Sequence, residues 1–69
     1  MLSHPHVVRC HRAAVSLNGR RVCLVMTDLA LTPDDPTFNQ TVYDSLMGAA
    51  RAYLAVNPQF EDIRVVRAA

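Results

Sequence analysis

The stretch Val15-Ser16-Leu17-Asn18-Gly19-Arg20-Arg21-Val22 decides the fold of this 69-residue chain, because an Asn-Gly pair there separates two apolar segments. Asn-Gly favours a two-residue type I′ turn, in which both residues adopt a positive φ. The sequence therefore predicts a β-hairpin whose strands run from about residue 6 to 17 and from about residue 20 to 29.

The length of this turn predicts which face of the hairpin is buried. Across a two-residue turn at 18–19, the numbers of paired residues add up to 37. The more apolar face then carries Val15, Val22, Leu24 and Met26, and we expect these side chains to contact the helix and form the core.

The same register predicts that the two cysteines stay apart. Cys10 and Cys23 share a face in it but lie four residues apart along the ladder, which is about 13 Å at ~3.3 Å per residue. The Cα atoms of a disulfide lie within ~7 Å of each other. We therefore expect both thiols to be free, without a Cys10–Cys23 bond.

The rest of the chain predicts one helix and one further strand. Prolines interrupt the loop after the hairpin, and either Thr32 or Asp35 is expected to cap a helix over residues 37–56. Asn57-Pro58 ends this helix, because the residue before proline avoids the α conformation. Residues 62–67 are expected to form the last strand.

These elements predict an α+β fold, in which a three-stranded sheet with β-β-α-β chain order carries one long helix on one face. Residues 1–69 are few enough for a single domain. A helix joins the second and third strands, so we expect these two strands to run parallel. The spatial order 2-1-3 is favoured over 1-2-3, because a crossover over one intervening strand centres the helix on the narrow sheet.

The composition favours a protein that buries surface against a partner. The apolar fraction is 51% and the charged fraction only 19%, which is unusual for a monomer of this size.

The start of the chain does not resemble a signal peptide, and no apolar run approaches the ~18 residues of a membrane span. We expect a cytoplasmic protein with reduced thiols and no membrane contact.

The helix is apolar over nearly half of its circumference, which is more than one small sheet requires. One stripe, formed by Phe38, Val42, Leu46, Ala49 and Tyr53, is expected to cover the sheet. The neighbouring stripe is then left over and is the predicted homodimer interface, and it consists of Tyr43, Met47, Ala50 and Leu54. Gly48 within this segment has two interpretations, a close helix contact or a neutral exposed position.

All seven basic residues are arginines, the residue best suited to bidentate contacts with carboxylates and phosphates. The candidate partner-binding residues are those expected around the sheet, namely Arg12, Arg20, Arg21, Arg64 and Arg67. The alternative to a protein partner is nucleic acid. It is the weaker interpretation, because none of the four aromatic residues lies on a predicted strand to stack bases and the net charge is only +1.

Catalytic and metal chemistry have little support in the sequence. The best candidates for metal ligands are His4, His6 and Cys10, whose side chains point to the same side of an extended segment. Pairs of histidines at this spacing are common by chance, so no metal or cofactor is expected. Cys10 and His11 are neighbours on a predicted strand and point to opposite faces, so they do not form a nucleophile and base pair. We expect no enzymatic activity.

The functional expectation is therefore a small, non-enzymatic, homodimeric interaction module. Such a module binds and modulates another protein, for example as an inhibitor, and chains of this size are often accessory proteins of phages or mobile elements. A nucleic-acid-binding regulator that uses the arginines remains the alternative.

Overall fold

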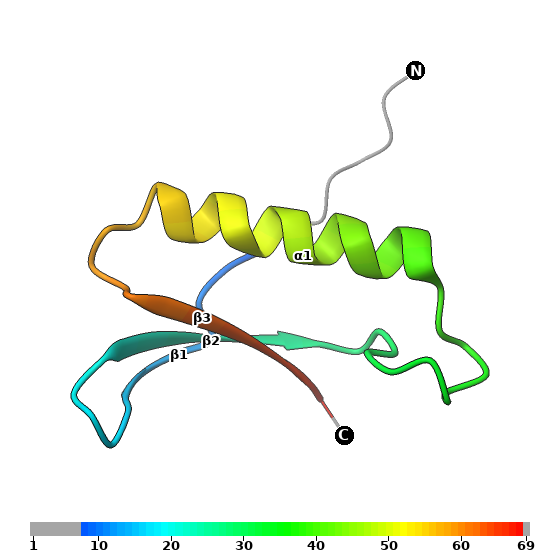
Figure 1. The fold of residues 1–69 in the computed structure, drawn as a ribbon, viewed down its shortest axis with the longest axis horizontal. Helices are drawn as coiled ribbons and strands as arrows, with labels where there is room; N and C mark the ends of the chain where they lie inside the picture. The colour runs from blue at the N-terminus through cyan, green and yellow to red at the C-terminus, as the bar shows by residue number, and fades with distance from the viewer. Residues whose placement is uncertain (1–7, 69) are drawn as a thin grey trace.

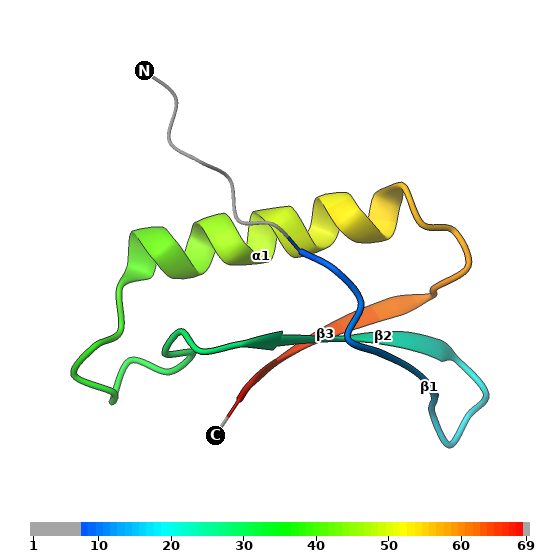
Figure 2. The same ribbon diagram turned by 180° about the vertical axis from the view of Figure 1, so that it is seen from behind.

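The computed structural model describes residues 8–68 and shows a three-stranded sheet with one helix along one of its faces (Figure 1). The same arrangement is seen from behind in Figure 2. The elements follow the order β1 (Arg12–Val15), β2 (Arg21–Thr27), α1 (Gln40–Ala55) and β3 (Asp62–Arg67). The predicted α+β class and chain order are confirmed, and the bounds of β3 match the prediction.

The central strand of the sheet is β2, and the spatial order is β1-β2-β3. β2 and β3 are parallel, as predicted, and pair continuously from Val22↔Asp62 to Thr27↔Arg67. The favoured order 2-1-3 is therefore wrong. β1 has only four residues, so β2 offers β3 a longer edge for backbone hydrogen bonds than β1 does.

The hairpin turn contains three residues and not two. The Gly19 N–H donates to the Ser16 carbonyl at 2.9 Å, and the Ser16 N–H donates to the Arg20 carbonyl at 2.8 Å. Gly19 has a φ of +84°, and within residues 8–68 no residue other than glycine has a positive φ, which excludes a type I′ turn at Asn18. This is the three-residue hairpin in which a type I turn is followed by a left-handed glycine.

One extra turn residue shifts the register, so that paired numbers add up to 36, as in Ala13↔Cys23 and Ala14↔Val22. A shift by one residue exchanges the two faces of a strand. Cys23 and Val25 therefore lie on the same face as Ile63 and Val65, which face α1.

The predicted core face is consequently wrong, because Val22, Leu24 and Met26 lie on the side of the sheet opposite α1. Val22 is nevertheless buried, whereas Met26 is 41% and Val15 69% exposed. The apolar residues that the described structure buries are Val22, Cys23, Val25, Ala30, Leu46 and Ala50.

The helix begins three residues later than predicted, because Asn39 caps it in place of Thr32 or Asp35. The Asn39 side chain accepts a hydrogen bond from the Val42 N–H at 3.1 Å. Phe38, just before the cap, contacts Tyr43 with ring centroids 5.6 Å apart. This contact is a hydrophobic staple, which is common at the start of a helix. At the other end, Asn57 donates its side-chain amide to the Tyr53 carbonyl at 2.7 Å, and the helix stops before Pro58.

Candidate interaction surfaces

The face of the sheet opposite α1 is not covered by any other element of residues 8–68 (Figures 1 and 2). Side chains alternate between the two faces of a strand. The residues on this uncovered side, here called the open sheet face, are Arg12 and Ala14 of β1, Val22, Leu24 and Met26 of β2, and Asp62, Arg64 and Val66 of β3. Met26 and Val66 remain 41% and 38% exposed, so the face offers apolar area to a partner.

Two arginines flank the centre of this face. Leu24 pairs with Arg12 on one side and with Arg64 on the other. Neighbouring strands are ~4.8 Å apart, so the row places a guanidinium on each side of a half-buried leucine. Both arginines are exposed, and no hydrogen bond or ion pair within the described residues engages either side chain.

A hollow of about 530 Å³ lies at the hairpin end of the open sheet face. Its lining includes Val22, the turn residues 16–18, and the polar residues Arg20, Asp62 and Arg64. The Arg20 guanidinium donates to the Glu61 carbonyl at 3.3 Å, which holds it at the rim. The hollow thus combines the apolar residues Leu17 and Val22 with two arginines and one carboxylate.

The remaining two predicted partner-binding arginines are engaged in contacts within the chain. The Arg21 side chain donates from Nε to the Gln59 carbonyl. The Arg21 backbone N–H also donates to the Glu61 carboxylate at 2.9 Å, which joins the start of β2 to the segment after α1. Arg67 forms an ion pair with Asp35. The structure therefore places Arg12 and Arg64 on either side of Leu24 and Arg20 at the rim of the hollow, and it engages Arg21 and Arg67 in contacts within the chain.

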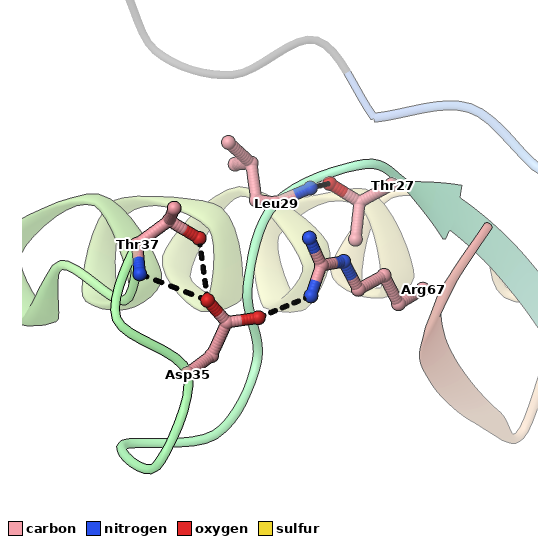
Figure 3. Close-up of polar contacts among 5 residues, drawn as sticks. All are labelled: Thr27, Leu29, Asp35, Thr37 and Arg67. Carbon is pink, nitrogen blue, oxygen red and sulfur yellow. Dashed lines mark hydrogen bonds and ion pairs between the residues drawn. The ribbon is translucent and has the colours of Figure 1, made fainter. Parts of the chain in front are cut away.

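Asp35 is the centre of a small polar cluster at the end of the sheet (Figure 3). One carboxylate oxygen accepts hydrogen bonds from the Thr37 N–H at 2.8 Å and from the Thr37 hydroxyl at 2.7 Å, and the other accepts from Arg67. The hydrogen bonds from Thr37, followed by Arg67, lower the pKa of Asp35 to about 2. Asp35 therefore caps the turn before α1 and does not act as a general acid near neutral pH.

The predicted dimer residues line a groove between α1 and the outer side of β3. The groove has a volume of about 420 Å³. Ala50 is buried, whereas Tyr43, Met47 and Leu54 are half-buried. All four helix residues line the groove, together with Leu31, Ile63, Val65 and the polar residues Arg51 and Asp62. β3 is an edge strand, so its outer backbone groups have no strand partner in the described chain.

The two cysteines are closer than predicted. Burial of the Cys23 thiol, together with the proximity of the Cys10 thiol, raises the pKa of Cys23 to about 12. The expected separation of ~13 Å, based on ~3.3 Å per residue, is therefore wrong. Both cysteines are free thiols, and Cys23 is fully buried.

The metal candidates His4 and His6 lie outside the described residues. Within residues 8–68, no group of three or more His, Cys, Asp and Glu side chains is placed to hold a metal ion. In the same range, no helix combines the length and the hydropathy that a bilayer-spanning helix requires.

Comparison with known proteins supplies no function for these surfaces. The chain matches no protein-family model, and no curated protein or solved structure shows significant similarity to it.

Proposed function

We propose that this protein is a small, non-enzymatic interaction module that binds and modulates another protein through its open sheet face. The observation that carries the proposal is the row Arg12–Leu24–Arg64 across the three strands. It combines an apolar centre with two exposed arginines that are not engaged within the described chain.

The chemistry of this face defines the partner that would bind it. Guanidinium groups form paired hydrogen bonds with carboxylates, and Met26 and Val66 provide exposed apolar area beside them. A complementary partner presents an apolar side chain to Leu24 and carboxylates to Arg12 and Arg64. Binding of this kind would inhibit a partner whose functional surface carries these groups.

Nucleic acid is the second candidate for the open sheet face, because arginines also bind phosphates. One observation makes it the weaker one, namely that β1, β2 and β3 contain no aromatic residue on which a base can stack.

We also propose that the protein forms a homodimer at the β3 edge, with the groove residues Tyr43, Met47, Ala50 and Leu54 covered by a second copy. Unpaired edge strands readily pair with another strand. An antiparallel β3 pair centred on Val65 sets Arg64 against Val66 and Ile63 against Arg67, so no like charges are opposed. In this register, odd-numbered residues pair with odd-numbered residues and even-numbered with even-numbered, so the corresponding faces of the two sheets coincide. Both helices then lie on the same face of one continuous sheet, and the two grooves adjoin.

An affinity experiment with matched variants tests the proposed function. The immobilised wild type, the variant Arg12→Ala/Arg64→Ala and the variant Arg9→Ala are each incubated with nuclease-treated bacterial lysate. Arg9 is exposed but precedes β1, so its variant controls for the loss of a positive charge elsewhere. We expect a protein that the wild type and Arg9→Ala retain and that the double variant loses.

Two results count against this proposal. One is that every retained protein binds the double variant as strongly as the wild type. The other is that the purified wild type binds a fluorescent single-stranded oligonucleotide at physiological salt and the double variant does not, which would support the nucleic-acid alternative.

A further inference from the structure

A bulge at the start of β1 changes the face on which Cys10 lies. Arg12 is the ladder partner of Leu24, and the His11 N–H also donates to the Leu24 carbonyl, at 2.7 Å. His11, just before β1, and Arg12, its first residue, thus both lie opposite Leu24 of β2, which is the arrangement of a β-bulge. Because side chains alternate between the two faces of a strand, this additional residue places Cys10 on the same face of the sheet as Cys23.

The chain before this bulge lies on the helix side of the sheet. Figures 1 and 2 show residues 8–11 rising from the start of β1 toward α1. Cys23 also faces α1 and is fully buried, and Cys10 is half-buried. Cys10 and Cys23 thus both lie on the helix side of the sheet, and Cys10 is the more accessible of the two thiols.

We propose that Cys10 and Cys23 are a site of oxidative modification, at which an intramolecular disulfide forms and fastens the segment before β1 to the central strand. The register and the bulge place both side chains on one face of the sheet, and Cys10 lies close enough to Cys23 to influence its thiol. This proposal is independent of the proposed function, because the site lies on the opposite side of the sheet from Arg12 and Arg64.

Oxidised glutathione is a sufficient oxidant for this step. Cys10, the more accessible thiol, loses its proton to solvent and attacks one glutathione sulfur. The glutathione disulfide breaks, a Cys10–glutathione bond forms, and one glutathione leaves and takes up a proton. The Cys23 thiolate then attacks the Cys10 sulfur and releases the second glutathione. Two protein thiols are oxidised, and one glutathione disulfide is reduced to two thiols.

The buried cysteine controls the rate of this sequence. Thiolates are the attacking species, and burial, with smaller contributions from the nearby Cys10, raises the pKa of Cys23 to about 12. The second step is therefore slower than the first, and the Cys10–glutathione adduct should be detectable before the disulfide.

The bond has a measurable effect on stability. It would close the chain between residues 10 and 23, a loop that contains the entire hairpin turn. Closing a loop of this length restricts the unfolded chain, and for a domain of this size we expect the melting temperature to rise by on the order of 10 °C.

The test uses the full chain, folded and fully reduced, incubated with oxidised glutathione. Remaining thiols are blocked with N-ethylmaleimide, and the protein is digested with trypsin and analysed by mass spectrometry. We expect a linked pair of peptides covering residues 10–12 and 22–51, and an intact mass lower by two hydrogens. The oxidised protein should melt at the higher temperature, and a reductant should reverse the change.

A matched variant distinguishes this site from general thiol reactivity. Cys10→Ala/His11→Cys keeps two thiols and moves one to the neighbouring position in the bulge, and we expect it to form the intramolecular bond at least tenfold more slowly. The proposal is overturned if the wild type accumulates only the Cys10–glutathione adduct, or if this variant forms its bond as fast as the wild type.

Discussion

Arg67, at the end of β3, forms an ion pair with Asp35, which precedes it by 32 positions and lies in the loop before α1 (Figure 3). The contact joins the last strand to the loop that leads into the helix. Thr37 donates two further hydrogen bonds to the same carboxylate. The Asp35 carboxylate therefore joins β3 to the loop that leads into α1, so its protonation state should affect the stability of the domain.

The first prediction concerns the acid sensitivity that this cluster produces. The pKa of Asp35 is lowered from 3.8 to about 2 in the folded protein. A lowered folded-state pKa adds stability above the unfolded value, and this stability is lost as the pH falls from about 4 toward 2. We expect Asp35→Asn to lower the melting temperature at pH 7 and to reduce its dependence on pH between 2 and 5, measured by circular dichroism.

Arg67→Ala provides the control for this prediction. Hydrogen bonds from Thr37 are the largest cause of the low pKa of Asp35, so Arg67→Ala should retain most of the wild-type pH dependence. If Arg67→Ala and Asp35→Asn show the same flat profile, the ion pair and not Thr37 sets the pKa.

The second prediction concerns the turn. Gly19 has a φ of +84°, a conformation that costs a residue with a Cβ atom ~1–2 kcal/mol. Gly19→Ala should therefore lower the free energy of unfolding by about 1 kcal/mol in urea denaturation. Asn18 does not share the positive φ, so Asn18→Ala should cost clearly less. Equal costs at the two positions would favour a type I′ turn.

The third prediction concerns Gly48 in the middle of α1. A Cβ atom added there would have no neighbour within 4 Å, so the structure contains no close contact that requires glycine. Gly48→Ala should increase the free energy of unfolding by ~0.5–1 kcal/mol, because alanine is the better helix former. A destabilised variant would indicate that a partner helix approaches Gly48.

The fourth prediction concerns the dimer. Met47 is half-buried and lines the groove beside β3, and burying such a side chain contributes ~1.5–3 kcal/mol. Met47→Glu should shift the sedimentation equilibrium from dimer to monomer. Ser45→Glu adds the same charge on an exposed part of α1 and should leave the dimer intact. The dimer proposal is contradicted if the wild type is monomeric at ~100 μM. The free energy of association is then less favourable than about −5.5 kcal/mol.

The fifth prediction separates structural arginines from binding arginines. Arg21 donates to the Gln59 carbonyl, and the loss of one such hydrogen bond costs ~0.5–1.5 kcal/mol. Arg21→Ala should therefore lower stability, whereas Arg12→Ala/Arg64→Ala should leave the melting temperature within a few degrees of the wild type. If the double variant unfolds, the open sheet face depends on these arginines for stability and not for binding.

The order of the elements followed from local signals in the sequence. Asn39 to Asn57 contains the apolar periodicity of a helix, and Pro58 cannot continue it, so the helix and its end were predicted closely. The alternating residues of 62–67 form β3 as predicted. The parallel pairing of β2 and β3 also followed from chain order, because a helix between two strands carries the chain back to the starting end of the sheet.

The faces of the sheet were decided by tertiary structure. Asn18-Gly19 is compatible with two turns that differ by one residue in length, and one residue reverses every side chain on the strand. The longer turn moved Cys23 and Val25 beneath α1 and left Leu24 between Arg12 and Arg64 on the open sheet face. The bulge at His11 then brought Cys10 to Cys23, by a backbone hydrogen bond that no local sequence pattern specifies. The sequence by itself determined which elements form, through short-range conformational preferences, and only long-range pairing decided which side chains meet.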